Sequence, residues 1–346
     1  MPSTIADARD TTSTGSHGAN ATASHATNLA GYVSRLNAIF EAAATKHDAH
    51  RSAASIMAEA ARDPSFLAAS LAHHLEAPDA LSRTHYPVLA MELESNPLYE
   101  LVVNCWIPLP GGDTDLSTKA IHHHGELLLT TATAFGPGYG HWLLSQPRLV
   151  DRDAGIYATD LIERGVHGLG EVAFVDAYVA HLPMYPASLT VTICLWSSRS
   201  QRTWKDSLKH LRIVSRHRET LRAVAVRTGL ARRLDVTVAD TFDFYPVESG
   251  FAAIREREEF PRGPNEDYLQ SLFHIVQATG NGDLAAVIER RLEREGSPAN
   301  RELIRELLDR LREGVSIPAC LSPGQYDVPT ANFHVTDIER ALAAAS

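Results

Sequence analysis

The large apolar residues of the first part of the chain recur at helical spacing. From Asn28 onward they return every three or four residues, which places them on one face of a helix; they are Leu29, Tyr32, Val33, Leu36, Ile39 and Phe40. Similar spacing continues to Leu75, and Asp63 is placed to cap the helix that follows it. Residues 1–28 contain few large apolar residues and are expected to be disordered or loosely attached. We therefore predict a helical segment over residues 29–86.

The pattern changes after residue 86 to short runs of aliphatic, β-branched and aromatic residues. Gly and Pro separate these runs, which is typical of strands joined by tight turns. The runs lie at 98–107, 118–131, 141–145, 148–150, 155–159, 163–167, 171–175 and 189–196. Short strands at this spacing are typical of a sandwich or a barrel. We therefore predict a β-barrel over residues 87–198.

Helical patterns return after the predicted barrel. Basic residues recur throughout residues 199–222. They are expected either to form the solvated face of a helix or to attract an anionic substrate. Residues 234–240 fit either one more strand or a buried loop. Apolar stripes predict helices at 268–276, 284–295 and 300–313. Residues 199–346 are accordingly predicted to be mostly helical, and the fold class is α+β, with a central antiparallel β-barrel flanked by helical segments on both sides.

Charge and cysteine content exclude several classes of protein. The 346 residues include 32 Lys and Arg against 42 Asp and Glu, and the net charge of −10 argues against nucleic acid or an anionic membrane as the partner. Three widely spaced cysteines without a CxxC motif, Cys105, Cys194 and Cys320, are typical of reduced thiols. The chain shows no signal-peptide core and no run near the roughly 20 apolar residues of a membrane span. A cytoplasmic protein with a small-molecule substrate is expected.

One stretch of the predicted barrel holds a group of potential metal ligands. If residues 118–131 form one strand, His122, His124 and Glu126 point to the same face. Imidazoles at alternate strand positions stand roughly 7 Å apart and can converge on one ion. A third ligand has to come from elsewhere, and His181, shortly before the last predicted strand, is the best candidate. The sequence therefore predicts a metal site at His122, His124 and His181.

This histidine pattern resembles that of the cupins. Members of that superfamily carry two short metal motifs on neighbouring strands of a small barrel, the first with H-x-H and the second with one more His. Residues 122–125, His-His-His-Gly, resemble the first motif and His181 the second, and the resemblance covers residues 98–197. It is closer to the thiol dioxygenase-like branch, whose iron is held by three histidines; Leu128 and Leu129 stand where many cupins have Glu. The resemblance implies Fe(II), although other divalent metals also accept imidazole ligands.

Five further residues are candidates for catalysis or substrate contact. Glu126 is a candidate fourth ligand, an acceptor that orients a ligating imidazole, or a general base. His141 and Tyr185 lie close in sequence to the expected mouth of the barrel and are candidates for substrate contact or proton donation, as are Tyr139 and His167. A structural role is the alternative for His141, Tyr185, Tyr139 and His167.

Three functions are compatible with such a site. The first, implied by the resemblance, is a non-haem, metal-dependent cupin oxygenase that acts on a small thiol or amino-acid-like molecule. The second uses the same centre for lyase, isomerase or hydrolase chemistry without O₂, and oxygen uptake during turnover distinguishes the two. The third is a non-enzymatic binding barrel. Apolar stripes on the flanking helices also predict a homodimer.

Overall fold

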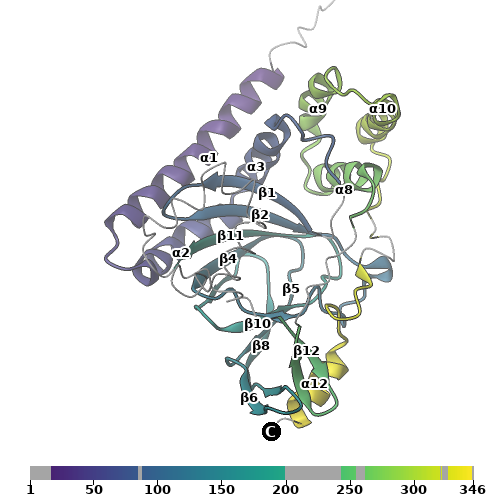
Figure 1. The fold of residues 1–346 in the computed structure, drawn as a ribbon. Coiled ribbons are helices and arrows are strands. Elements are labelled where there is room, and N and C mark those ends of the chain that lie inside the picture. Colours follow the sequence, from purple (N-terminus) through teal and green to yellow (C-terminus); the bar gives the residue numbers. More distant parts are fainter. Residues whose placement is uncertain are drawn as a thin grey trace, which may run out of the picture.

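The computed structural model describes residues 17–84, 88–198, 243–254, 262–319, 321 and 326–344. Antiparallel sheets occupy the middle of the chain, and helices lie at both of its ends (Figure 1). The fold class is therefore α+β, as the sequence predicts. The strand or loop expected at 234–240 and the basic series at 199–222 lie outside the described residues.

Three helices form the N-terminal part: α1 (His17–Ala42), α2 (Lys46–Arg62) and α3 (Pro64–Glu76). The first begins at His17 and not near residue 28, which corrects the expectation of disorder for the end of that segment. Alanine, the strongest helix former, recurs in residues 17–28 without the apolar stripe that would reveal a helix. Asp63 caps α3 as predicted, because its carboxylate accepts a hydrogen bond of 2.9 Å from the backbone N–H of Ser65.

The strands form two antiparallel sheets. The five-stranded sheet has the order β1 (Val88–Ser95), β2 (Glu100–Trp106), β11 (Thr190–Ser198), β4 (Leu127–Phe135) and β9 (Val172–Val175). The eight-stranded sheet has the order β6 (Arg148–Asp151), β7 (Ile156–Ala158), β13 (Gly250–Ala253), β12 (Asp243–Val247), β3 (Ile121–His122), β10 (Ala180–Pro183), β5 (Tyr139–Leu144) and β8 (Leu161–His167). A short 3₁₀ helix, η1 (Pro110–Gly112), lies between β2 and β3.

The order of the strands identifies the architecture. From β2 to β5 and again from β8 to β11 the chain passes repeatedly from one sheet to the other, and strands that are adjacent in a sheet are mostly distant in sequence. The orders β2-β11-β4-β9 and β3-β10-β5-β8 are those of an eight-stranded jelly roll made of two Greek keys. This is the closed antiparallel barrel that the sequence predicts, and its closure leaves an interior between the two sheets.

The N-terminal helices cover the outer face of the five-stranded sheet (Figure 1). Alternate residues of its strands, such as Val103 of β2 and Ile193 of β11, join the helices in the main apolar core. The residues between them, such as Asn104 and Cys194, face the barrel interior and contact each other there. Cys194 and Cys105 are both buried and free, as expected of reduced thiols.

The C-terminal part contains strands as well as helices. The β12–β13 hairpin extends the eight-stranded sheet between β3 and β7, and so adds two short strands to a segment that the sequence predicts to be mostly helical. Phe244 and Phe251, one on each strand, are buried in an apolar cluster on the outer face of that sheet. Two short strands of mixed polarity are hard to recognise because each carries only four or five residues of pattern.

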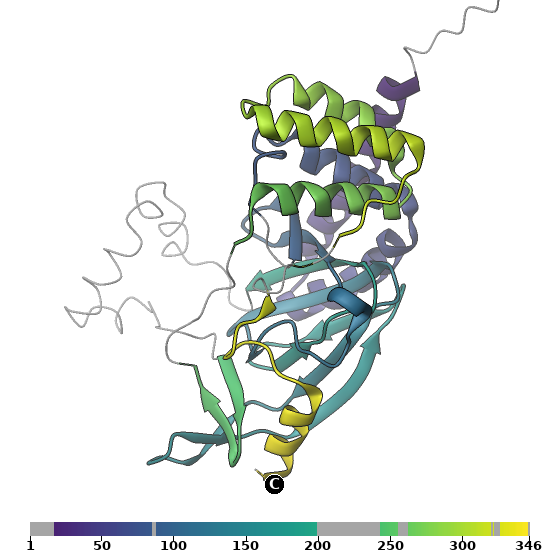
Figure 2. The ribbon, with the colours of Figure 1, turned by 90° about the vertical axis from the view of Figure 1, so that its right-hand side faces the viewer.

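The C-terminal helices form two groups (Figure 2). The first is α8 (Asn265–Ala278), η2 (Gly282–Leu284), α9 (Ala285–Leu292) and α10 (Pro298–Glu313), which share the main core with α1–α3 and include the helices predicted there. The second is α12 (Val335–Ala344), which packs on the β12–β13 hairpin. No helix within the described ranges combines the length and the hydropathy that a membrane span requires.

Candidate metal centre

The stretch expected to be one strand is interrupted at its centre. β3 ends at His122, a turn follows, and β4 begins at Leu127. Gly125 in this turn has a φ of 61°, a conformation that glycine adopts without the penalty of a Cβ atom. The expectation that His122, His124 and Glu126 share one face of a continuous strand is therefore wrong, because residues 123–126 are not part of a strand. The turn nevertheless directs two of the three toward each other.

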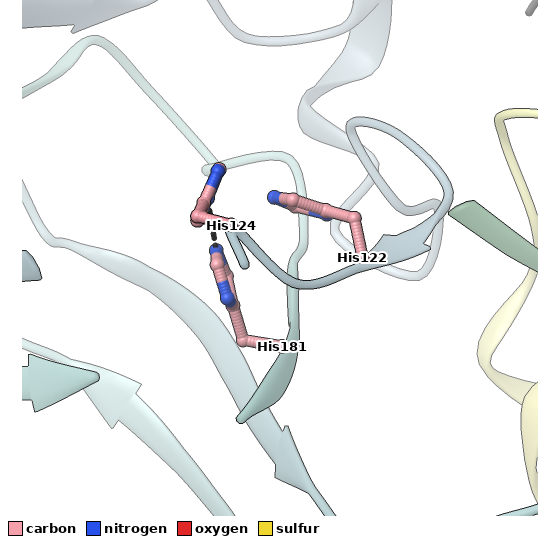
Figure 3. Close-up of side chains that lie close together, drawn as sticks. All are labelled: His122, His124 and His181. Atoms are coloured by element: carbon pink, nitrogen blue, oxygen red, sulfur yellow. Dashed lines mark hydrogen bonds between the residues drawn. The ribbon is translucent and has the colours of Figure 1, made fainter. Parts of the chain in front are cut away.

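The three histidines predicted as ligands converge on one point (Figure 3). His181 on β10 is the direct cross-strand partner of His122 on β3, with 4.2 Å between the ring centroids. The His124 ring reaches both from the turn, at 4.7 Å from the His122 ring and 4.8 Å from the His181 ring. One nitrogen from each ring lies within 4.8 Å of the other two. The fold thus assembles this group from two strands and a turn.

The hydrogen bonds of these rings fit a metal ion. His122 Nδ1 donates to the carbonyl oxygen of Ala120 at 2.8 Å, so its Nε2 carries the lone pair that a metal needs. This Nε2 is buried without a hydrogen-bond partner, and so is Nδ1 of His181. An unsatisfied buried polar atom costs free energy, which a coordinate bond from His122 Nε2 would recover. Nε2 of His124 and Nε2 of His181 are 3.3 Å apart, and an ion would replace that contact.

The electrostatic surroundings keep two of the ligands neutral. Burial lowers the pKa of the His122 and His181 imidazoles well below its usual range, since the charged form loses its hydration. The positive charge of Lys119 acts on both rings in the same direction. A neutral imidazole is the form that binds metal, so at neutral pH His122 and His181 need not lose a proton first. Three such donors suit Fe(II), Zn(II) and other divalent first-row ions.

The structure brings one of the three predicted catalytic residues to this cluster. The His141 ring on β5 lies 5.6 Å from the His181 ring, and burial lowers the pKa of His141 to about 4. Glu126 is exposed at the end of the turn and is not among the grouped ligands. Tyr185 is buried in the main apolar core, with its ring 6.3 Å from that of Tyr326.

The interior beyond His141 is lined by aromatic and hydroxyl side chains. The His167 ring lies 6.4 Å from that of His141, and its Nδ1 shares a hydrogen bond of 2.7 Å with Thr133. The Tyr139 ring lies 6.0 Å from that of His141, and burial raises the pKa of its phenol above the usual range. These residues, which the sequence nominated beside His141, form one connected wall of the barrel interior.

Two residues near the cluster escaped the sequence analysis. Trp196 of β11 places its ring edge-on against His124, with 4.5 Å between the centroids. Asp243 of β12 is buried and directly opposite His122 in the sheet. The only signal for Asp243 was a single acidic residue inside the short apolar run at 242–245. Its position becomes visible only once β12 is paired with β3.

Comparisons with known proteins cover about a third of the chain. No protein-family model and no curated protein matches the chain. Similar solved structures include an RmlC-like cupin from Shewanella frigidimarina, with 11% identity over 34% of this chain and 81% of that chain and a TM-score of 0.21. A double-stranded β-helix protein from Klebsiella pneumoniae has 13% identity over 36% of this chain and 90% of that one, with a TM-score of 0.22.

An oxalate oxidase is also similar, with 13% identity over 35% of this chain and 56% of that chain and a TM-score of 0.22. Likeness at such identities and scores carries no information about chemistry, so the assignment of the fold rests on the order of the strands. The barrel has the jelly-roll fold that cupins share with other proteins. Within this barrel, the three converging histidines form the candidate metal centre.

Proposed function

We propose that this protein is a non-haem, metal-dependent cupin oxygenase that uses Fe(II) to act on a small thiol or amino-acid-like molecule. The observation that supports it best is the group of His122, His124 and His181, whose ligand nitrogens lie within 4.8 Å of one another inside the barrel. Three protein ligands leave part of the coordination sphere of a divalent ion open. When bound, such an ion supplies Lewis acidity and, as Fe(II), a place for O₂ beside the substrate.

Three groups around the ligands each perform one task in this proposal. Trp196 packs against His124 and restricts the approach of water to that ring. His141 is neutral at physiological pH because burial lowers its pKa to about 4, and it offers a hydrogen-bonding nitrogen on a ring whose centroid lies 5.6 Å from that of His181. Ala120 fixes the tautomer of His122 through its carbonyl oxygen. The ligand set is thereby preorganised for one ion.

The test is oxygen consumption by protein loaded anaerobically with Fe(II). Protein made without a polyhistidine tag is mixed with a panel of small thiols and amino acids, and O₂ uptake is compared with product formed. Stoichiometric uptake that disappears in His181→Ala is the expected result. Product without O₂ uptake would replace the oxygenase by a lyase, isomerase or hydrolase. Absence of bound metal even after Fe(II) is added would leave a binding barrel.

We also propose that two copies of the chain associate through the helical segments. The proposal comes from the apolar stripes that the sequence shows on these helices; most of the apolar residues in those stripes lie in the main core. Light scattering of the purified protein tests it, and a strictly monomeric mass at all concentrations contradicts it.

A further inference from the structure

Two turns of the backbone meet beside the candidate metal ligands. Residues 124–127 lead from β3 into β4, and residues 176–179 lead from β9 into β10, so both turns cross from one sheet to the other. In each turn the N–H of the last residue donates to the carbonyl oxygen of the first, at 3.1 Å and 3.2 Å. The two turns are joined by a hydrogen bond of 2.8 Å, in which the N–H of Tyr178 donates to the carbonyl oxygen of Gly125.

Both backbone polar groups of Gly125 are held in this arrangement. Its carbonyl oxygen accepts from Tyr178, and its N–H donates to Nδ1 of His123 at 3.0 Å. The buried ring of His123 lies in turn beside the ring of Tyr178, with 5.8 Å between the centroids. Tyr178 therefore restrains Gly125 on one side through its backbone and on the other side through His123. Gly125 directly follows His124, so the same contacts restrain the backbone of that candidate ligand.

Tyr178 adopts a backbone conformation that tyrosine normally avoids. Its φ is 63°, and in the part of the chain that the structure describes it is the only residue other than glycine with a positive φ. This conformation costs free energy for a residue with a side chain, and Gly or Asn is usual at the third position of a turn that requires it. Such strain persists only where the surrounding contacts determine the conformation. The φ angle sets the direction of the Tyr178 N–H relative to β10, and here that direction leads to Gly125.

We propose that Tyr178 is a positioning residue for the metal centre, which holds the turn at residues 124–127 in the shape that brings His124 to the ion. This inference rests on the proposed function, since it requires the metal centre. Strand pairing positions His122 and His181, whereas His124 lies in the turn and depends on what holds that turn. Groups that orient a ligand without binding the metal contribute to metal affinity. Tyr178 would thus act on the ion through His124.

The test measures Co(II) affinity and the stability of the metal-free protein in the same set of variants. Tyr178→Gly removes the ring, and Tyr178→Phe keeps it. Phe174→Ala is the matched control, because the ring of Phe174 on β9 lies against His47 and His50 of α2, at 6.0 Å and 5.7 Å between centroids. Titration followed by the visible absorption of bound Co(II) gives the dissociation constant. The intensity of that absorption also reports the number and arrangement of the ligands.

Tyr178→Gly should bind Co(II) about tenfold more weakly and with an altered visible absorption, since His124 is no longer held in place. Its metal-free form should unfold at nearly the same temperature as the unchanged protein, because glycine adopts the positive φ without strain and this offsets the lost ring contact. Tyr178→Phe should retain the affinity, and Phe174→Ala should leave it unchanged. If Tyr178→Gly fails to fold by circular dichroism, Tyr178→Asn provides the test, since Asn tolerates the same backbone conformation and lacks the ring.

The outcomes separate this inference from the proposed function. An unchanged dissociation constant in Tyr178→Gly overturns the role of Tyr178 and leaves the metal centre intact; if the metal-free form is also less stable, the role of Tyr178 is structural alone. Equal weakening in Tyr178→Phe or in Phe174→Ala also overturns it, because the ring of Tyr178 is then not what holds the turn. Failure of the unchanged protein to bind Co(II) removes the metal centre, and the inference with it.

Discussion

His122 and His181 are direct cross-strand partners, and their rings are 4.2 Å apart between centroids. Their separation is therefore set by the pairing of β3 with β10 and not by the conformation of a loop. Strand pairing is maintained by backbone hydrogen bonds, which are indifferent to the presence of an ion. The sheet thus positions two of the three candidate ligands, and only His124 depends on the turn.

Replacement of any one of the three histidines by Ala should remove the metal. Each loss leaves two imidazoles, too few to hold a divalent ion against water and buffer. Elemental analysis of untagged protein should find one ion per chain in the unchanged protein and almost none in His122→Ala, His124→Ala or His181→Ala. His73→Ala is the control, because His73 is exposed on α3. Equal metal content in all these variants would end the hypothesis of a metal centre.

Metal binding should quench the fluorescence of Trp196. Its ring lies edge-on to His124 with 4.5 Å between centroids, and a paramagnetic ion such as Co(II) quenches an indole at this short range. Titration with Co(II) should give a decrease in emission that is mostly absent from Trp196→Phe. Trp142→Phe should retain it, since Trp142 packs on the outer face of the sheet beneath Arg164. Equal quenching in both variants would place the ion elsewhere.

Stability should decrease in acid partly through His50, which ties α2 to the barrel. Its Nδ1 and Nε2 each share a hydrogen bond of 2.8 Å, with Thr130 and Ser197, and burial lowers its pKa to about 4. The unfolded chain, with a His pKa near 6.5, binds the proton first, so the stability present above pH 6.5 is lost as the pH falls toward 4. The loss from this one group is about 2 kcal/mol near pH 4.5.

Urea unfolding of chelator-treated protein at pH 7 and pH 4.5 tests this expectation against His50→Gln. The variant should be less stable at pH 7 by about 1 kcal/mol, because glutamine cannot satisfy both hydroxyls. Between the two pH values it should lose less stability than the unchanged protein. Parallel losses in both proteins would show that His50 does not titrate in the way that its burial implies.

Gly136 and Gly155 should respond very differently to Ala, although both have positive φ, 84° and 68°. A Cβ atom at Gly136 would overlap the carbonyl oxygen of Leu189, whereas the same atom at Gly155 meets nothing within 4 Å. Gly155→Ala should cost about 1 kcal/mol from backbone strain alone. Gly136→Ala should cost about 3 kcal/mol, since overpacking adds to the strain. Thermal unfolding measures both, and equal costs would mean that the turn yields freely.

The convergence of the three histidines was predictable because its signal is local and chemical. His122 and His124 lie two residues apart, and His181 precedes a run of alternating apolar residues that indicates a strand. The barrel was predictable for a similar reason, since β2, β4 and β11 bury alternate residues against the helices. Where the apolar residues of the sequence are also the buried residues of the structure, the sequence is sufficient to predict the element.

The features that the sequence did not predict depend on backbone conformation and on the pairing of strands that lie far apart in the sequence. The apolar pattern around Gly125 does not change where the strand stops, so nothing in it revealed the turn that leaves Glu126 exposed. Asp243 becomes a neighbour of His122 only through a pairing across 121 positions of sequence, which periodicity does not encode. The start of α1 was missed because alanine favours helices without forming an apolar stripe.

The position of β12 in the eight-stranded sheet determines when that sheet can be completed during synthesis of the chain. The ribosome releases all three histidines and the eight jelly-roll strands before it reaches Asp243, so a nascent chain that ends after β11 already contains every candidate metal ligand. In such a chain the edge of β3 still lacks its C-terminal neighbour, β12. Asp243 is therefore the last residue to join the three histidines on this side of the sheet.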